Sequence, residues 1–168
     1  MTRLLIIDDH AVVRQGLVQA FKGNGFDSIE TAGNLADARA KIAAFNPDAV
    51  IVDLNLPDGS GLEIVQWVRK HSAEVALIIL SLNDPAKFIK IARSSGANAY
   101  LSKSQSMQEI ISSVTFALAN PGSFTSALTA DQPRDFDLTP REIEVLYLLA
   151  EGASNLDISS KLYISLST

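Results

Sequence analysis

Four short apolar runs of the sequence are each followed by a residue that could do chemistry. Leu4–Ile7 precedes Asp8 and Asp9, Ala49–Val52 precedes Asp53, Ala76–Leu80 precedes Ser81, and Ala99–Leu101 is soon followed by Lys103. A carboxylate beside a buried strand costs free energy unless something pairs with it. The three acids would also repel one another if they met, so the pattern predicts that a cation joins them.

The types of these residues indicate phosphoryl chemistry. Oxygen ligands without a Cys or His suit a hard ion, and Mg²⁺ is the natural choice. Lys103 would add a second positive charge and Ser81 a hydroxyl donor. Such a pocket would stabilise a small dianion on one carboxylate, so Asp53 could act as a nucleophile toward phosphorus and form an aspartyl phosphate. We expect His10 to open the first helix near the rim of this pocket.

The elements that must position these residues follow from the pattern of apolar positions. The runs above, with a weaker one near Ser28–Thr31, alternate with segments of helical spacing. The expected inward faces are Val13, Leu17 and Phe21; Leu62, Val65 and Val68; and Met107, Ile110 or Ile111, Val114 and Leu118. Asn34 and Ser60 are expected N-caps. Five strand–helix units up to about Ala119 predict a doubly wound α/β domain with a five-stranded parallel sheet, in which ligands gather at the carboxyl ends of the strands.

Composition excludes several classes of protein. The 168 residues are 47% hydrophobic and contain no cysteine, which favours a globular chain without disulfides. The formal net charge of −5 is the wrong sign for a chain dominated by nucleic-acid contacts. The first apolar run is too short for a signal peptide or a membrane span, so we expect a cytoplasmic protein without a membrane partner.

The constellation resembles the receiver domain of bacterial two-component response regulators. The resemblance is carried by D-D at 8–9, D-L-N-L-P-D-G-S-G at 53–61, Ser81, Tyr100 and Lys103. It implies that Asp53 is the phosphoacceptor and that Asp8, Asp9, Asp53 and the backbone carbonyl of Asn55 hold Mg²⁺. It further implies that Ser81 bonds a phosphoryl oxygen, that Lys103 pairs with the phosphoryl group, and that Tyr100 swings inward as a coupled switch. Asn55 and Asn83 would flank the path of the water that removes the group.

The sequence changes character after Ala119. Residues 120–137 contain Pro121, Gly122 and Pro133 and are predicted to be a linker between a receiver at 1–119 and a segment at 138–168. Thr139 and Pro140 mark a helix start, Gly152 its end, and Ser154 the start of a second helix. This pair resembles the beginning of a LuxR-type helix-turn-helix domain, and the combination resembles the NarL/FixJ family of response regulators.

The resemblance places the start of the recognition helix near Leu166, and the sequence given ends at Thr168. We therefore expect a truncated helix-turn-helix, with DNA binding confined to a full-length form. After Leu138 the segment has two basic residues, Arg141 and Lys161, against four acidic ones, which also predicts weak phosphate attraction.

The function predicted is a phosphorylation-activated, non-enzymatic regulator of transcription, with a sensor histidine kinase as phosphodonor and possible homodimers. Two alternatives stay open. One is a Mg²⁺-dependent phosphohydrolase with Asp53 as nucleophile, although haloacid dehalogenase-type enzymes have an acid where this sequence has Asn55. The other is an interaction module that is never phosphorylated, which would not need the two acids, Ser81 and Lys103 together.

Overall fold

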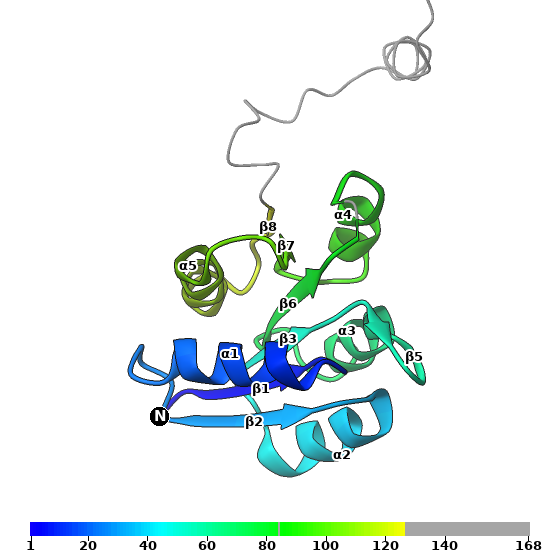
Figure 1. The fold of residues 1–168 in the computed structure, drawn as a ribbon. Coiled ribbons are helices and arrows are strands. Elements are labelled where there is room, and N and C mark those ends of the chain that lie inside the picture. The colour runs from blue at the N-terminus through cyan, green and yellow to red at the C-terminus, as the bar shows by residue number, and fades with distance from the viewer. Residues whose placement is uncertain (84, 127–168) are drawn as a thin grey trace, which may run out of the picture. The chain divides into compact units, whose positions relative to one another are not determined.

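A computed structural model describes residues 1–83 and 85–126, which belong to a unit spanning Met1–Gln132. Its main sheet is parallel with the strand order β2-β1-β3-β6-β7-β8, and a small hairpin, β4-β5, follows β3 (Figure 1). The strands are β1 (Arg3–Ile7), β2 (Ser28–Ala32), β3 (Ala49–Val52), β4 (Asn55–Leu56), β5 (Gly59–Ser60), β6 (Ala76–Ser81), β7 (Ala99–Ser102) and β8 (Thr125–Ser126). The helices are α1 (Ala11–Phe21), α2 (Leu35–Phe45), α3 (Gly61–Arg69), α4 (Pro85–Ser94) and α5 (Met107–Ala119).

Both faces of the sheet are buried, because side chains along the central strands point alternately to either side. On one face, strand residues such as Ile7 and Val52 pack against α2, α3 and α4. On the other, residues such as Ile6 and Ile51 pack against α1 and α5. A strand buried on both faces has no polar alternation, which is why these strands are continuous apolar runs in the sequence. The predicted doubly wound α/β fold is confirmed.

The helix starts follow the predicted caps. At α2, Asn34 Oδ1 accepts a hydrogen bond of 2.8 Å from the Asp37 backbone N–H. At α3, Ser60 and Glu63 form a reciprocal capping box. Each cap satisfies backbone N–H groups that a helix leaves unpaired at its start. The two expected N-caps are therefore confirmed.

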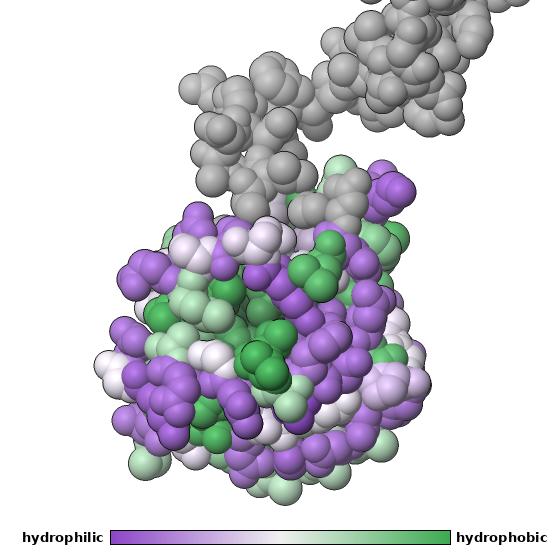
Figure 2. All heavy atoms as spheres, viewed as in Figure 1, coloured by the Kyte–Doolittle hydropathy of each residue, from purple (hydrophilic) through white to green (hydrophobic). Residues whose placement is uncertain are grey.

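The inward face of α5 differs from the prediction at its first residue. Ile110 and Val114 are buried as expected, whereas Met107 is exposed. Met107 begins the helix, and its Cε lies 4.0 Å from the position that a Cβ on Gly16 of α1 would occupy. Figure 2 shows a hydrophobic patch between α1 and α5, and the exposed large hydrophobic residues of these helices include Val12 and Met107.

The sheet has one strand more than the five predicted. Thr125 and Ser126 form β8 on the free edge of β7, within the stretch that the sequence predicts to be linker. The predicted LuxR-type helices at 138–168 lie outside the described residues. Within those residues, no helix is long and apolar enough to cross a membrane.

Candidate functional site

The carboxyl ends of β1, β3, β6 and β7 meet at one edge of the sheet, because these strands are parallel neighbours. Ile7 of β1 is paired with Val52 of β3, so the next residues, Asp8 and Asp53, lie side by side. The Asp53 N–H donates to the Ile7 carbonyl at 2.8 Å, which continues the ladder into the site. Both acids are buried, with exposed fractions of 2% for Asp8 and 4% for Asp53.

Lys103 bridges the two buried acids. Its Nζ lies 2.6 Å from Asp8 Oδ2 and 2.7 Å from Asp53 Oδ2, and its side chain is 7% exposed. Burial alone lowers the pKa of Lys103, but its hydrogen bonds to Asp53 and Asp8, and the attraction of their charges, outweigh burial and raise that pKa above its ordinary value. Lys103, expected from the sequence as a second positive charge beside Mg²⁺, therefore pairs directly with both buried acids.

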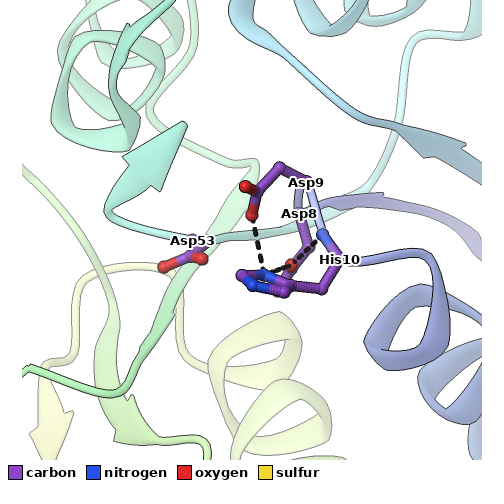
Figure 3. A group of neighbouring side chains, drawn as sticks. All are labelled: Asp8, Asp9, His10 and Asp53. Atoms are coloured by element: carbon purple, nitrogen blue, oxygen red, sulfur yellow. Dashed lines mark hydrogen bonds and ion pairs between the residues drawn. The ribbon is translucent and has the colours of Figure 1, made fainter. Parts of the chain in front are cut away.

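Asp9 and His10 complete the acidic cluster at its outer rim. His10 Nδ1 lies 2.8 Å from Asp9 Oδ1 and 3.2 Å from Asp8 Oδ1, and Asp53 faces this group from β3 (Figure 3). Ligand-type atoms of Asp8, Asp9, His10 and Asp53 all lie within 4.8 Å of one another. Three carboxylates exceed the one ammonium group of Lys103, so the donor set fits a divalent cation bound mainly through oxygen.

The hairpin after β3 holds the backbone around Asp53. The Asn55 N–H donates to Asp53 Oδ1 at 3.3 Å, and the Gly61 N–H donates to the Leu54 carbonyl at 2.9 Å. A Cβ on Gly61 would overlap the carbonyl oxygen of Asp53 and lie 2.8 Å from Val52 Cγ2. Only glycine fits at this position, so α3 begins in direct contact with the backbone of the proposed phosphoacceptor.

Ser81 and Tyr100 are joined through one residue, Asn83. The Asn83 N–H donates to Ser81 Oγ at 3.1 Å, and the Tyr100 hydroxyl donates to the Asn83 carbonyl at 3.3 Å. The Tyr100 residue is 1% exposed and lies in the core on the face covered by α2, α3 and α4. The Tyr100 ring, which the resemblance implies would swing inward, is already inward, held there by core packing and its bond to Asn83.

Two contacts of the cluster were not predicted from the sequence. Arg14 Nη1 of α1 donates to the Asp8 carbonyl at 2.5 Å, which fixes the turn that carries the acidic pair. His10 is the N-cap residue of α1, as expected, but the approach of its ring to Asp8 and Asp9 was not predicted. A basic residue one turn after a helix start was the available signal for Arg14, since such a side chain can reach back to the preceding strand end.

Comparisons with known proteins give the same picture. Residues 4–115 match the family described as response regulator receiver domain, and residues 137–168 match bacterial regulatory proteins of the luxR family. The chain is 30% identical to the transcriptional regulatory protein MctR of Rhizobium johnstonii, over 99% of this chain and 81% of MctR. It is 28% identical to the DNA-binding transcriptional activator EvgA of Escherichia coli, over 96% of this chain and 82% of EvgA.

A solved structure extends the likeness to three dimensions. The structure of a DNA-binding response regulator of the LuxR family from Staphylococcus aureus superposes with a TM-score of 0.66 at 28% identity, covering 70% of this chain and 99% of that one. The expectation of a truncated helix-turn-helix is not supported, because the luxR-family match extends over all of residues 137–168, which lie outside the described residues. With a receiver match over most of its length and a luxR-family match after it, the chain belongs to the response regulators that combine these two domains.

Proposed function

We propose that this chain accepts a phosphoryl group on Asp53 and that the modification controls transcription through its luxR-family segment. The observation that carries the proposal is the position of the Lys103 ammonium, 2.6 and 2.7 Å from the buried carboxylates of Asp8 and Asp53. A buried cluster with more acids than cations is costly as a purely structural device and suits a cation and an anion that arrive together.

In the proposed reaction Asp53 is the nucleophile. A carboxylate oxygen attacks the phosphorus of a phosphorylated imidazole on the donor protein, a P–O bond forms, and the P–N bond breaks with its electron pair passing to the imidazole nitrogen. Lys103 then donates a charge-assisted hydrogen bond to a phosphoryl oxygen. Mg²⁺, for which Asp8, Asp9, Asp53 and the backbone carbonyl of Asn55 would be the ligands, neutralises phosphoryl charge when bound.

The proposed response to phosphorylation runs through Ser81. Its Oγ is the acceptor for the Asn83 N–H at 3.1 Å, and we expect its side chain to reorient when the hydroxyl donates to a phosphoryl oxygen. Because Tyr100 is bonded to the carbonyl of the same Asn83, a change at Ser81 reaches Tyr100 through this one residue. Tyr100 would therefore respond from its inward position, by a shift in an existing equilibrium.

The proposed partners are a sensor histidine kinase as phosphodonor and DNA as the target of the luxR-family segment, with homodimers as the binding form. EvgA and the Staphylococcus aureus regulator, to which this chain is similar, are DNA-binding proteins, which supports the second of these. The exposed hydrophobic patch between α1 and α5 supports a protein partner beside the acidic cluster (Figure 2). A cytoplasmic location is part of the proposal, since the chromosome is there.

The phosphohydrolase alternative is not favoured. The residue two positions after Asp53 is Asn55, whose amide can orient a water molecule but cannot take its proton. The experiment that tests the proposal treats the chain with acetyl phosphate, with and without Mg²⁺, and follows its intact mass. We expect a Mg²⁺-dependent gain of one phosphoryl group that hydroxylamine removes. The proposal is contradicted if the mass does not increase, or if acetyl phosphate is hydrolysed without accumulation of an acyl phosphate on the chain.

A further inference from the structure

The segment that leaves α5 returns to the sheet. β8 pairs in parallel with the first half of β7, with Ala99 opposite Thr125 and Tyr100 opposite Ser126, and it lies beside β7 in Figure 1. In the sequence, the same segment leads toward the luxR-family match at 137–168. We call residues 121–126 the strap, because they tie the start of the predicted linker to the receiver.

One buried residue, Asn98, holds most of the strap. Its Nδ2 donates to the Pro121 carbonyl at 2.6 Å and to the Ser123 carbonyl at 3.1 Å. Its own carbonyl accepts the Thr125 N–H at 2.8 Å. Asn98 is 2% exposed, so these bonds are shielded from water and the strap has a defined docked position.

The docked strap nevertheless has weak points. β8 is two residues long, and Phe124 is only partly buried, with the Arg93 guanidinium 5.9 Å from its ring centroid. Thr125 Oγ1 is the one buried side-chain polar atom without a hydrogen-bond partner in the described part of the chain. A buried hydroxyl without a partner opposes docking, because it would find water if the strap were released. The docked and released states are therefore closer in free energy than the Asn98 bonds alone suggest.

A chain of contacts joins the acidic site to the strap, and its first link is the Lys103 N–H, which donates to the Ser81 carbonyl at 2.9 Å. Ser81 accepts the Asn83 N–H, Asn83 accepts the Tyr100 hydroxyl, and the Tyr100 backbone is paired with Ser126. Phe124 packs against the same core cluster as the Tyr100 ring. If the Ser81 side chain turns to a phosphoryl oxygen, the Asn83 N–H loses its acceptor. A shift of Asn83 would then move Tyr100, which belongs to β7, the strand that pairs with β8.

We propose that the strap is docked on β7 when Asp53 is unmodified and is released when Asp53 is phosphorylated, which frees the start of the linker. This inference rests on the proposed function, since it uses the phosphoryl group as the trigger. By linkage the coupling is reciprocal: whatever releases the strap must favour the phosphorylated state, and whatever tightens it must oppose that state.

Two substitutions at Thr125 have opposite expected effects. Thr125→Pro removes the N–H that bonds to Asn98, so it should loosen the strap. Thr125→Val keeps the shape and removes the unpaired buried hydroxyl, so it should tighten the strap. Neither residue change touches the acidic site, so an effect there must pass through the strap.

The test measures amide hydrogen exchange of Thr125 in the 168-residue chain, with and without Mg²⁺ and beryllofluoride, and beryllofluoride affinity by ¹⁹F NMR. We expect exchange to accelerate about fivefold or more on beryllofluoride binding, with tighter binding in Thr125→Pro and weaker binding in Thr125→Val. Unchanged exchange, or equal affinities in wild type and Thr125→Val, overturns the inference even if Thr125→Pro fails to fold. The mass of the acetyl phosphate-treated protein separates the two proposals: a labelled chain with an unresponsive strap leaves the proposed function standing, whereas an unlabelled chain overturns both.

Discussion

Two buried polar clusters lie at opposite ends of β7 and differ in how their polar groups are balanced. Before the strand, Asn98 Oδ1 accepts the Leu77 N–H and Arg69 Nη2, each at 2.9 Å. Arg69 also donates to the carbonyls of Gly96 and Ser72, at 2.9 and 3.1 Å. After the strand, Lys103 stands between two carboxylates, with a third nearby.

This difference in charge balance indicates that the Asn98 cluster is structural. The Asn98 cluster pairs its donors and acceptors with backbone groups of the fold and contains no carboxylate to compete for Arg69. Burial lowers the pKa of Arg69, yet a guanidinium stays charged at any physiological pH. The acidic cluster keeps more negative charge than Lys103 can balance, so its free energy is lowest only when a further cation binds. Substitutions in the two clusters should therefore respond differently to Mg²⁺ and to a phosphodonor.

The largest expected effect concerns the chemistry that only the acidic cluster performs. Asp53→Asn should abolish the hydroxylamine-sensitive mass gain, because an amide is not a nucleophile toward phosphorus. The matched control is Asp58→Asn. Asp58 is an exposed acid in the β4-β5 hairpin that follows Asp53, and its carboxylate accepts the N–H groups of Leu35 and Ala36. Full labelling of Asp53→Asn, or loss of label in Asp58→Asn, would contradict the site assignment.

The next effect is on stability. Lys103→Met leaves Asp8 and Asp53 without their cation, so without Mg²⁺ it should lower the free energy of unfolding by about 3 kcal/mol. Mg²⁺ should restore part of this loss, since it replaces the missing positive charge. Arg39→Met is the control: its exposed pair with Glu63 at 3.4 Å should contribute about 0.5 kcal/mol at most, whatever the Mg²⁺ concentration. Urea unfolding with and without Mg²⁺ measures both, and an equal loss in the two conditions for Lys103→Met would refute the charge argument.

At the other end of β7, Asn98→Ala should lower the free energy of unfolding by about 2 kcal/mol, because it leaves the buried Leu77 N–H without a partner. This loss should be the same with and without Mg²⁺. Asn24→Ala, which removes an exposed bond of 2.8 Å to the Ala20 carbonyl, should stay within about 0.5 kcal/mol of wild type. A Mg²⁺-dependent loss in Asn98→Ala would erase the distinction between the clusters.

Much of the acidic cluster could be inferred from the sequence, for physical reasons. Ala49–Val52 is predicted and observed with the same bounds, because a strand buried on both faces needs an unbroken apolar run. The meeting of Asp8, Asp53 and Lys103 follows from the rule that the carboxyl ends of parallel strands share an edge.

The Asn98 cluster and the strap could not be inferred in this way. β8 has no apolar run of its own, and its place is set by bonds to Asn98 and by the free edge of β7. A single buried asparagine carries no periodic signal. The inward position of Tyr100 was also missed, because its hydroxyl is satisfied by Asn83, a residue of a loop that no pattern relates to Tyr100.

A smaller effect is expected from alkaline pH. The folded-state pKa of Lys103 is raised above 10.5, so its pairs with Asp8 and Asp53 contribute their full stability below pH 10.5 and lose it as pH rises through the raised pKa. Without Mg²⁺, the difference in unfolding free energy between wild type and Lys103→Met should be constant from neutral pH to about 10 and then shrink. A difference that grows in that alkaline range would reverse the assigned sign.

The smallest effect concerns the lifetime of the phosphoryl group. Asn83→Leu should slow loss of the group by obstructing water, but by well below the roughly 100-fold that removal of a general base can cause, because an amide is not one. Asn55→Leu should act in the same direction. Dephosphorylation followed by the decay of the mass gain measures both, and unchanged decay in the two variants would count against a role for these amides.

The close approach of Gly61 to Asp53 has a consequence for inherited variation. Since any Cβ at position 61 would overlap the Asp53 carbonyl oxygen, a change there must displace the reactive residue even when it alters no charge. A saturation library scored for phosphorylation should therefore reject all nineteen replacements at Gly61 as firmly as those at Asp53. No substitution would be tolerated at either position: at Asp53 because its carboxylate reacts, and at Gly61 because there is no space for a Cβ.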